Sequence, residues 1–250
     1  MSGHSKWATI KRKKGATDAA RGRVFTKLIR EITTAARMGG GDVDGNPRLR
    51  KAVADAKAQQ MPADTIKRAL QRGTGDEEGV QYTEVLYEGT GPSGTLFLVE
   101  GMTDNRNRTV AELRKIFERR NGVLGTTGTA GWAFDHLGVI VLDKAGLSED
   151  KLMEAAVEAG AEDYRDEGEA WVVYTPPDQL YDVSGGLEKA GLTLQESKLA
   201  YVPKVKKPVT ENDAENCMNL VDSLDEHDDV QNVYADFDIS DEELARITGE

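Results

Sequence analysis

The chain has 250 residues, of which 38% are hydrophobic and 30% are charged, and its formal net charge is −12. This composition suffices for packed cores, and the absence of an apolar run of about 18 residues argues against a membrane-spanning segment. A single cysteine, Cys217, excludes an intrachain disulfide and is typical of a reducing compartment. We therefore expect one to three folded domains in a cytoplasmic protein.

The charge is divided unevenly along the chain. Residues 1–72 contain 17 Lys/Arg and 6 Asp/Glu, a net charge of +11. Residues 73–250 hold the other 15 basic and 38 acidic residues, a net charge of −23. Asymmetry of this size indicates an interaction region. A polyanion would be attracted to the first part and repelled by much of the rest, so the pattern predicts orientation as well as binding.

The basic part begins with the stretch GHSKWATIKRKK, in which an aromatic side chain stands among cations. That combination suits base stacking together with phosphate neutralisation. The predicted contacts are Lys6, Trp7, Lys11, Arg12, Lys13, Lys14, Arg21, Arg23 and Lys27. Two alternatives stay open: the stretch is a solvated end, or Trp7 and Ile10 dock it on its own domain.

Three amphipathic helices follow. Apolar residues at helical spacing predict a helix over 18–38, which ends at a run of three glycines. Asn46 can cap a second helix with Pro47 at its first position, and a third follows Pro62 and ends near Gly73. Residues 73–79 read as a linker. We expect a basic helical, nucleic-acid-binding domain over 1–78.

The remainder predicts an α+β fold. Two β-rich runs around GTGPSG read as a hairpin, and a helix follows at 107–120. From residue 136 the order strand, helix, strand, strand, helix, strand is that of a ferredoxin-like βαββαβ unit. A helix and a strand remain after residue 206, too little to fold alone. We therefore expect an inserted βαββαβ domain at 136–206, a discontinuous α+β domain made of 79–135 plus 207–240, and a loosely held helix or tail at residues 240–250.

Motifs of catalysis are not evident. GTGPSG matches G-x-G-x-x-G, but strands flank it on both sides, whereas a dinucleotide site needs a strand and a helix. The segment 42–53 lacks the glycine and glutamate positions of a calcium loop, and the three histidines lack zinc spacing. P-loop and G-x-S-x-G motifs are absent from the sequence. We expect no catalytic residue, no metal, no cofactor and no small-molecule substrate.

The stretch DNRNRT at 104–109 opens the helix 107–120. Arg106 and Arg108 would lie beside backbone N–H groups at a helix N-terminus, which is a ready anion site. Alternatively, Asp104 or Asn105 caps the helix and the two arginines pair with acidic neighbours. The sequence leaves both interpretations open.

Several long motifs resemble the YebC/PmpR family, which includes mitochondrial translational activators. They are GHSKWATIKRKK, the helical stretch from RGRVFTKLIREITTAAR to RGTG, TDNRNRT and LGTTGTAGWAF. The resemblance covers nearly the whole chain and implies a helical N-terminal domain, two α+β domains and a cytoplasmic, non-enzymatic role in gene expression. Family members often read W-A-N-I-K-H where this chain has Thr9 and Arg12, which argues against base reading there, while Arg12 adds charge for phosphate.

We therefore expect a non-enzymatic regulator that binds nucleic acid, first of all a DNA-binding transcriptional regulator. An alternative is a translation factor that binds ribosomal RNA and relieves stalling of the ribosome, for example at proline runs. In a second alternative, the acidic inserted domain is a protein-interaction module. No membrane partner is expected.

Overall fold

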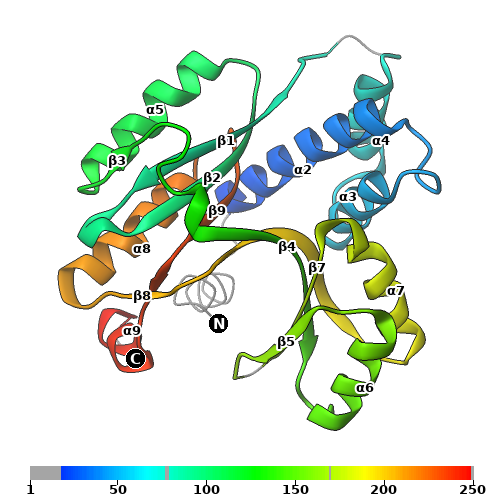
Figure 1. Cartoon of the computed structure of the whole chain (residues 1–250). Helices are drawn as coiled ribbons and strands as arrows, with labels where there is room; N and C mark the ends of the chain where they lie inside the picture. The colour runs from blue at the N-terminus through cyan, green and yellow to red at the C-terminus, as the bar shows by residue number, and fades with distance from the viewer. Residues whose placement is uncertain (1–17, 77–78, 169, 249–250) are drawn as a thin grey trace.

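The computed structural model describes residues 18–76, 79–168 and 170–248. Figure 1 shows a group of helices beside two sheets that carry their own helices, which confirms the predicted α+β multidomain fold. Among the helices of this described part, none has the combined length and apolar character that a membrane crossing requires.

The helical group consists of α2 (Asp18–Gly39), α3 (Pro47–Ala58) and α4 (Ala63–Thr74). Its core includes Ile32, Leu49 and Ala56, each fully buried. Asn46 caps α3 as predicted, because its side-chain oxygen accepts the N–H of Leu49 at 3.1 Å. A Cβ at Gly73 would lie 2.5 Å from the carbonyl oxygen of Thr33, so the close packing of α4 on α2 requires glycine there.

Sheet A has the strand order β3-β1-β2-β9, in which β9 is Val230–Ala235. The hairpin of β1 (Thr83–Thr90) and β2 (Leu96–Thr103) turns at Pro92–Gly94, so the G-x-G-x-x-G stretch is a turn between strands. Two helices, α5 (Arg106–Arg119) and α8 (Glu211–Asp225), pack on this sheet through a core that includes Phe97, Phe117 and Leu220. The short strand β3 (Val123–Leu124) pairs with β1.

Cys217 lies in this core and is fully buried. Burial raises the pKa of its thiol to about 11, although a contact with the Thr95 hydroxyl acts in the opposite direction. The cysteine is therefore a packed residue of this core.

Sheet B has the strand order β5-β6-β4-β7, and its neighbouring strands are antiparallel. The chain order is β4 (Phe134–Asp143), α6 (Glu149–Ala159), β5 (Asp163–Asp166), β6 (Ala170–Thr175), α7 (Leu180–Lys189) and β7 (Leu194–Pro203). Leu152 and Leu187 of the two helices pack against Ile140 and Val173 of the sheet. This is the βαββαβ order that the sequence predicted.

After sheet B the chain returns to sheet A. β9 (Val230–Ala235) pairs with β2, and a two-stranded ladder joins β8 (Lys207–Pro208) to β10 (Phe237–Asp238). The domain boundaries themselves stay a prediction. The C-terminal segment differs from expectation, because α9 (Asp241–Thr248) buries Leu244 in the core of sheet A and is therefore packed rather than loose.

Candidate nucleic-acid interface

One face of α2 carries cations that contact the far end of the chain. Arg23, Lys27 and Arg30 lie at spacings of four and three residues, which places them on one side of the helix. Lys27 Nζ donates to Asp225 Oδ1 at 2.8 Å, and Arg23 forms a longer ion pair of 3.4 Å with Glu226. These contacts join α2 to the C-terminal end of α8.

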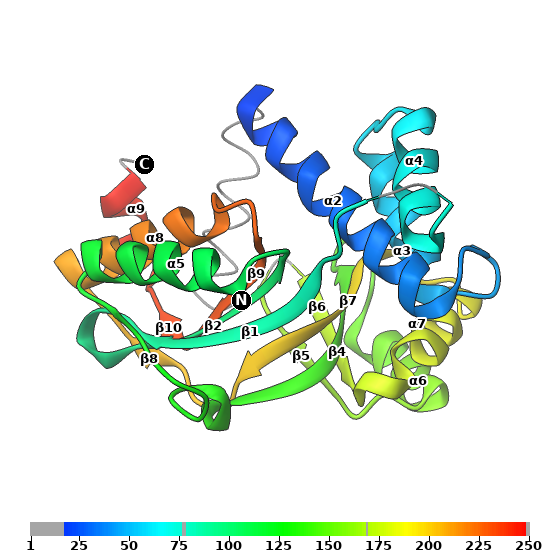
Figure 2. The ribbon, with the colours of Figure 1, turned by 90° about the horizontal axis from the view of Figure 1, so that it is seen from above.

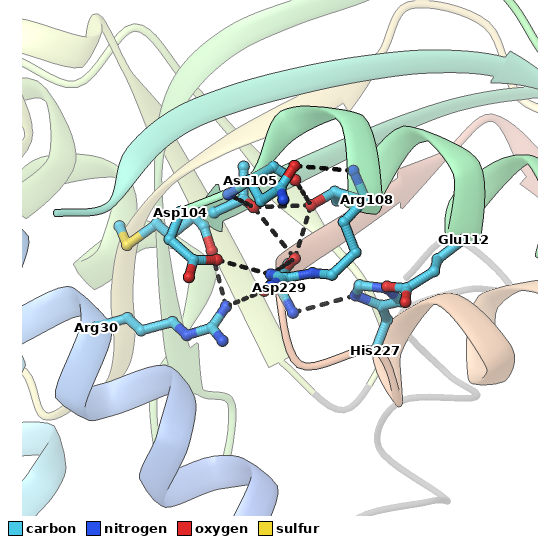
Figure 3. A network of polar contacts seen from close by, with 10 residues as sticks. Arg30, Asp104, Asn105, Arg108, Glu112, His227 and Asp229 are labelled. Carbon is cyan, nitrogen blue, oxygen red and sulfur yellow. Dashed lines mark hydrogen bonds and ion pairs between the residues drawn. The ribbon is translucent and has the colours of Figure 1, made fainter. Parts of the chain in front are cut away.

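Arg30, the third of these cations, pairs with Asp229, whose side chain is 3% exposed. Asp229 is the centre of a network of ion pairs and hydrogen bonds. Arg30 donates to Asp229 Oδ1 at 2.6 Å and to the Met102 carbonyl oxygen at 2.8 Å. Figure 3 shows Arg30 from α2 and Arg108 from α5 reaching this carboxylate from two directions.

The second oxygen of Asp229 is equally engaged. It accepts from Thr109 Oγ1 at 2.6 Å, from Arg108 at 2.8 Å and from Thr103 Oγ1 at 3.2 Å. Burial alone would raise the pKa of Asp229, but the hydrogen bonds from Thr109, Arg108 and Arg30 outweigh it and hold the pKa well below its usual range. Asp229 is thus an ionised hub that joins three elements.

The start of α5 resolves the two interpretations of DNRNRT differently for its two arginines. Asn105 caps the helix by accepting the Arg108 N–H at 3.1 Å. Arg108 also pairs with Asp104 at 2.7 Å, so its guanidinium is held between Asp104 and Asp229. Arg106 is exposed and makes no ion pair with the residues that the structure describes.

His227 extends the network toward α5. The Asp229 N–H donates to His227 Nδ1 at 3.1 Å, so a neutral imidazole carries its proton on Nε2 and donates to Glu112 at 2.9 Å. Glu112, His227 and Asp229 offer three potential metal ligands close together. A cation there would have to displace the arginines that already neutralise Asp229, so the geometry is that of an ion-pair network.

The remaining predicted residues fall into two groups. Lys6, Trp7, Lys11, Arg12, Lys13 and Lys14 lie outside the described residues. Arg21 is exposed, with its guanidinium 3.5 Å from Gln60 Oε1 and 5.6 Å from the centre of the Phe25 ring. The structure thus brings Arg23, Lys27 and Arg108 into one network but gives each of them an acidic partner.

Sequence reasoning missed a second set of cations on the outer face of the helical group. Lys57 of α3 and Lys67 and Arg68 of α4 are exposed and form no ion pair within the described ranges. The signal was present in the helical period, because Ile66, Ala69 and Gly73 of α4 are buried and leave positions 67 and 68 facing outward. Nearby, Arg37 and Arg72 line an open depression of about 850 Å³.

Comparison with known proteins places the chain among relatives over nearly its full length. The model of the TACO1/YebC protein N-terminal domain matches residues 5–76, and that of the TACO1/YebC second and third domain matches residues 82–237. A probable transcriptional regulatory protein of Geobacter sulfurreducens is 53% identical, over 99% of this chain and 100% of that protein. A protein of the same name from Acidithiobacillus ferrooxidans is 55% identical, over 99% and 98%.

A solved structure is similar as well. The crystal structure of a conserved hypothetical protein from Aquifex aeolicus has a TM-score of 0.81 and 41% sequence identity. The match covers 90% of this chain and 93% of that one.

Proposed function

The chain belongs to the TACO1/YebC family, as its motifs predicted, and we propose that it is a non-enzymatic regulator of gene expression that binds nucleic acid through its helical group. The names of the relatives favour a role in transcription, with duplex DNA as the ligand. The observation that carries the proposal is the set of exposed cations on α3 and α4.

The outer face of α3 and α4 suits phosphate contact. Lys57, Lys67 and Arg68 are exposed and lack carboxylate partners among the described residues, so a phosphate has no internal ion pair to break there. Each phosphate neutralised by lysine or arginine releases counterions and makes the affinity depend on salt. The basic stretch from Lys6 to Lys14 belongs to the same part of the sequence and would add contacts of the same kind.

The cations of α2 contribute less in this proposal. Lys27 and Arg30 already pair with Asp225 and Asp229 at 2.8 and 2.6 Å. A phosphate at this face would have to replace those carboxylates. The acidic remainder of the chain repels a polyanion, so the outer face of the helical group would point toward the ligand.

The test is the salt dependence of binding. We expect the affinity for duplex DNA to fall with a slope of about −0.9 in log–log form for each phosphate contact. The variant K57A/K67A/R68A should reduce the magnitude of that slope by about 2.7. The matched control K115A/K151A/K189A removes three exposed lysines from α5, α6 and α7 and should leave the slope unchanged.

A second candidate ligand is ribosomal RNA, since a long acidic remainder also suits docking in a confined RNA site. Cosedimentation with ribosomes at physiological salt, with duplex DNA as competitor, separates the two ligands. Binding of neither DNA nor RNA, or binding without salt dependence, would refute the proposal.

A further inference from the structure

Trp132 is a large aromatic side chain held out from the surface, with 67% of it exposed. It lies between β3 and β4, and its indole N–H donates to the Thr129 carbonyl oxygen at 3.2 Å. Exposure to this extent sacrifices much of the burial that usually stabilises tryptophan. Its environment therefore requires explanation.

The segment that carries the ring is anchored by a buried carboxylate. Glu88 of β1 accepts the N–H groups of Gly128, Ala130 and Gly131 at 3.0, 2.6 and 2.8 Å. Burial by itself would raise the pKa of Glu88, but these backbone donors outweigh it, and the pKa lies below its ordinary value. The charged form therefore persists at neutral pH and fixes the backbone on which Trp132 stands.

Lys204 contacts the backbone of the segment that carries the ring. The Lys204 N–H donates to the Ala133 carbonyl oxygen at 2.9 Å, and its ammonium group donates to the Trp132 carbonyl oxygen at 3.1 Å. Figure 2 shows the segment before β4 next to the end of β7. The sequence there, PKVKKPVT at 203–210, has three lysines and no acidic residue, inside a part of the chain whose net charge is −23.

Lys204 is held only loosely by a carboxylate. It lies 3.4 Å from Asp135, and both side chains are about half exposed. An exposed pair of this kind contributes about 0 to 1 kcal/mol to stability. A phosphate can therefore replace Asp135 at little cost, in contrast to the shorter and more buried pairs around Asp229. Lys206 reaches instead toward Glu167, whose side chain is only 12% exposed, and is not counted with this surface.

We propose that Trp132 and Lys204 form a second nucleic-acid contact, specific for a single strand. An unpaired base would stack on the indole, and an adjacent phosphate would lie against the Lys204 ammonium group. The proposal rests on the proposed function and extends it by naming the form of the ligand. A base inside a duplex is stacked on its neighbours and offers no free face to the ring.

The distance between this surface and the cations of α3 and α4 determines how long a nucleic acid must be to contact both. In both ribbon views α4 and the segment before β4 lie well apart, so an oligonucleotide too short to reach from one to the other occupies one contact at a time. A longer ligand with an unpaired stretch would engage both, and its second binding event would be intramolecular.

The experiment measures binding of a labelled single-stranded 12-mer and of a blunt duplex of equal length by fluorescence anisotropy. W132A should weaken single-strand binding about 5- to 150-fold, the effect of losing one base–aromatic stack, while W132F retains most of the affinity. Duplex binding should not change. K204A should reduce the single-strand salt slope by about 0.7, and the control K151A should not.

Tryptophan emission gives a second readout. In a W7F background the emission comes from exposed Trp132 and buried Trp171, so quenching by the single strand reports on Trp132. If the wild-type chain binds the 12-mer but W132A binds equally well and Trp132 is not quenched, this inference is wrong and the proposed function stands. If no form binds any nucleic acid, both fail. Self-association that W132A removes would assign the surface to a second copy and overturn the inference.

Discussion

The helical group carries two sets of cations that differ in whether a carboxylate neutralises them. On the inner face, Arg23, Lys27 and Arg30 of α2 pair with carboxylates near the end of α8. On the outer face, Lys57, Lys67 and Arg68 are exposed and unpaired within the described ranges. The difference teaches that a net charge of +11 measures how many cations are present and not how many are available to a ligand.

Removal of the hub should have the largest effect. Asp229→Ala leaves Arg30 and Arg108 without their shared carboxylate and should lower the free energy of unfolding by about 3 kcal/mol, because a buried charge is left unpaired. Urea unfolding measures this loss. The neighbouring exposed Asp228→Ala should stay within about 0.5 kcal/mol of wild type. Equal effects of the two substitutions would contradict the hub role.

The same hub predicts a pH dependence. The pKa of folded Asp229 lies below the unfolded value of about 3.9, so its stabilisation is present above that pH and is lost as the pH falls through the folded pKa. The difference in unfolding free energy between wild type and Asp229→Ala should therefore be constant from pH 5 to 7 and shrink below about pH 4. Urea midpoints across this range test it. A difference that grows on acidification would contradict the depressed pKa.

Freeing the inner cations should increase nucleic-acid affinity. The variant D225N/E226Q removes the carboxylates that pair with Lys27 and Arg23. Each phosphate contact regained should increase affinity about fivefold at 0.15 M salt, as follows from the counterion slope. The control E154Q/E158Q makes the same change in net charge on exposed positions of α6. Similar gains in both variants would mean that only overall charge matters.

The outer cations should matter least to stability. K57A/K67A/R68A should change the unfolding free energy by less than about 0.5 kcal/mol for each substitution, since these exposed side chains form no ion pair in the described part. Thermal unfolding of this variant beside Asp229→Ala measures the contrast. A large loss would show that the outer face is structural and would remove the distinction between the two sets.

The sequence predicts local elements well because hydrophobic period, caps and turns are local signals. The hairpin at 83–103, the Asn46 cap and the βαββαβ order follow from such patterns. The pairing of charged residues that lie far apart in the sequence does not follow from such local patterns. Lys27 and Asp225 are 198 positions apart, and their contact depends on how α2 docks on α8. For the same reason the sequence could not choose between the two interpretations of Arg108.

Two other differences have physical causes. The C-terminal segment was expected to be loosely held, yet Leu244 of α9 packs into the core of sheet A. Lys67 and Arg68 are not part of a dense basic run, and only the buried positions Ile66, Ala69 and Gly73 of α4 show that these two cations face outward.

The late return of the chain to sheet A has a consequence for synthesis on the ribosome. The helical group comes first and can fold early, since its core needs no residue beyond the third helix. Asp225, Glu226 and Asp229 lie far beyond the third helix in the sequence and leave the ribosome after it. Until they emerge, the inner cations of α2 lack these partners, so a nascent chain presents both basic faces, and the finished chain closes one of them.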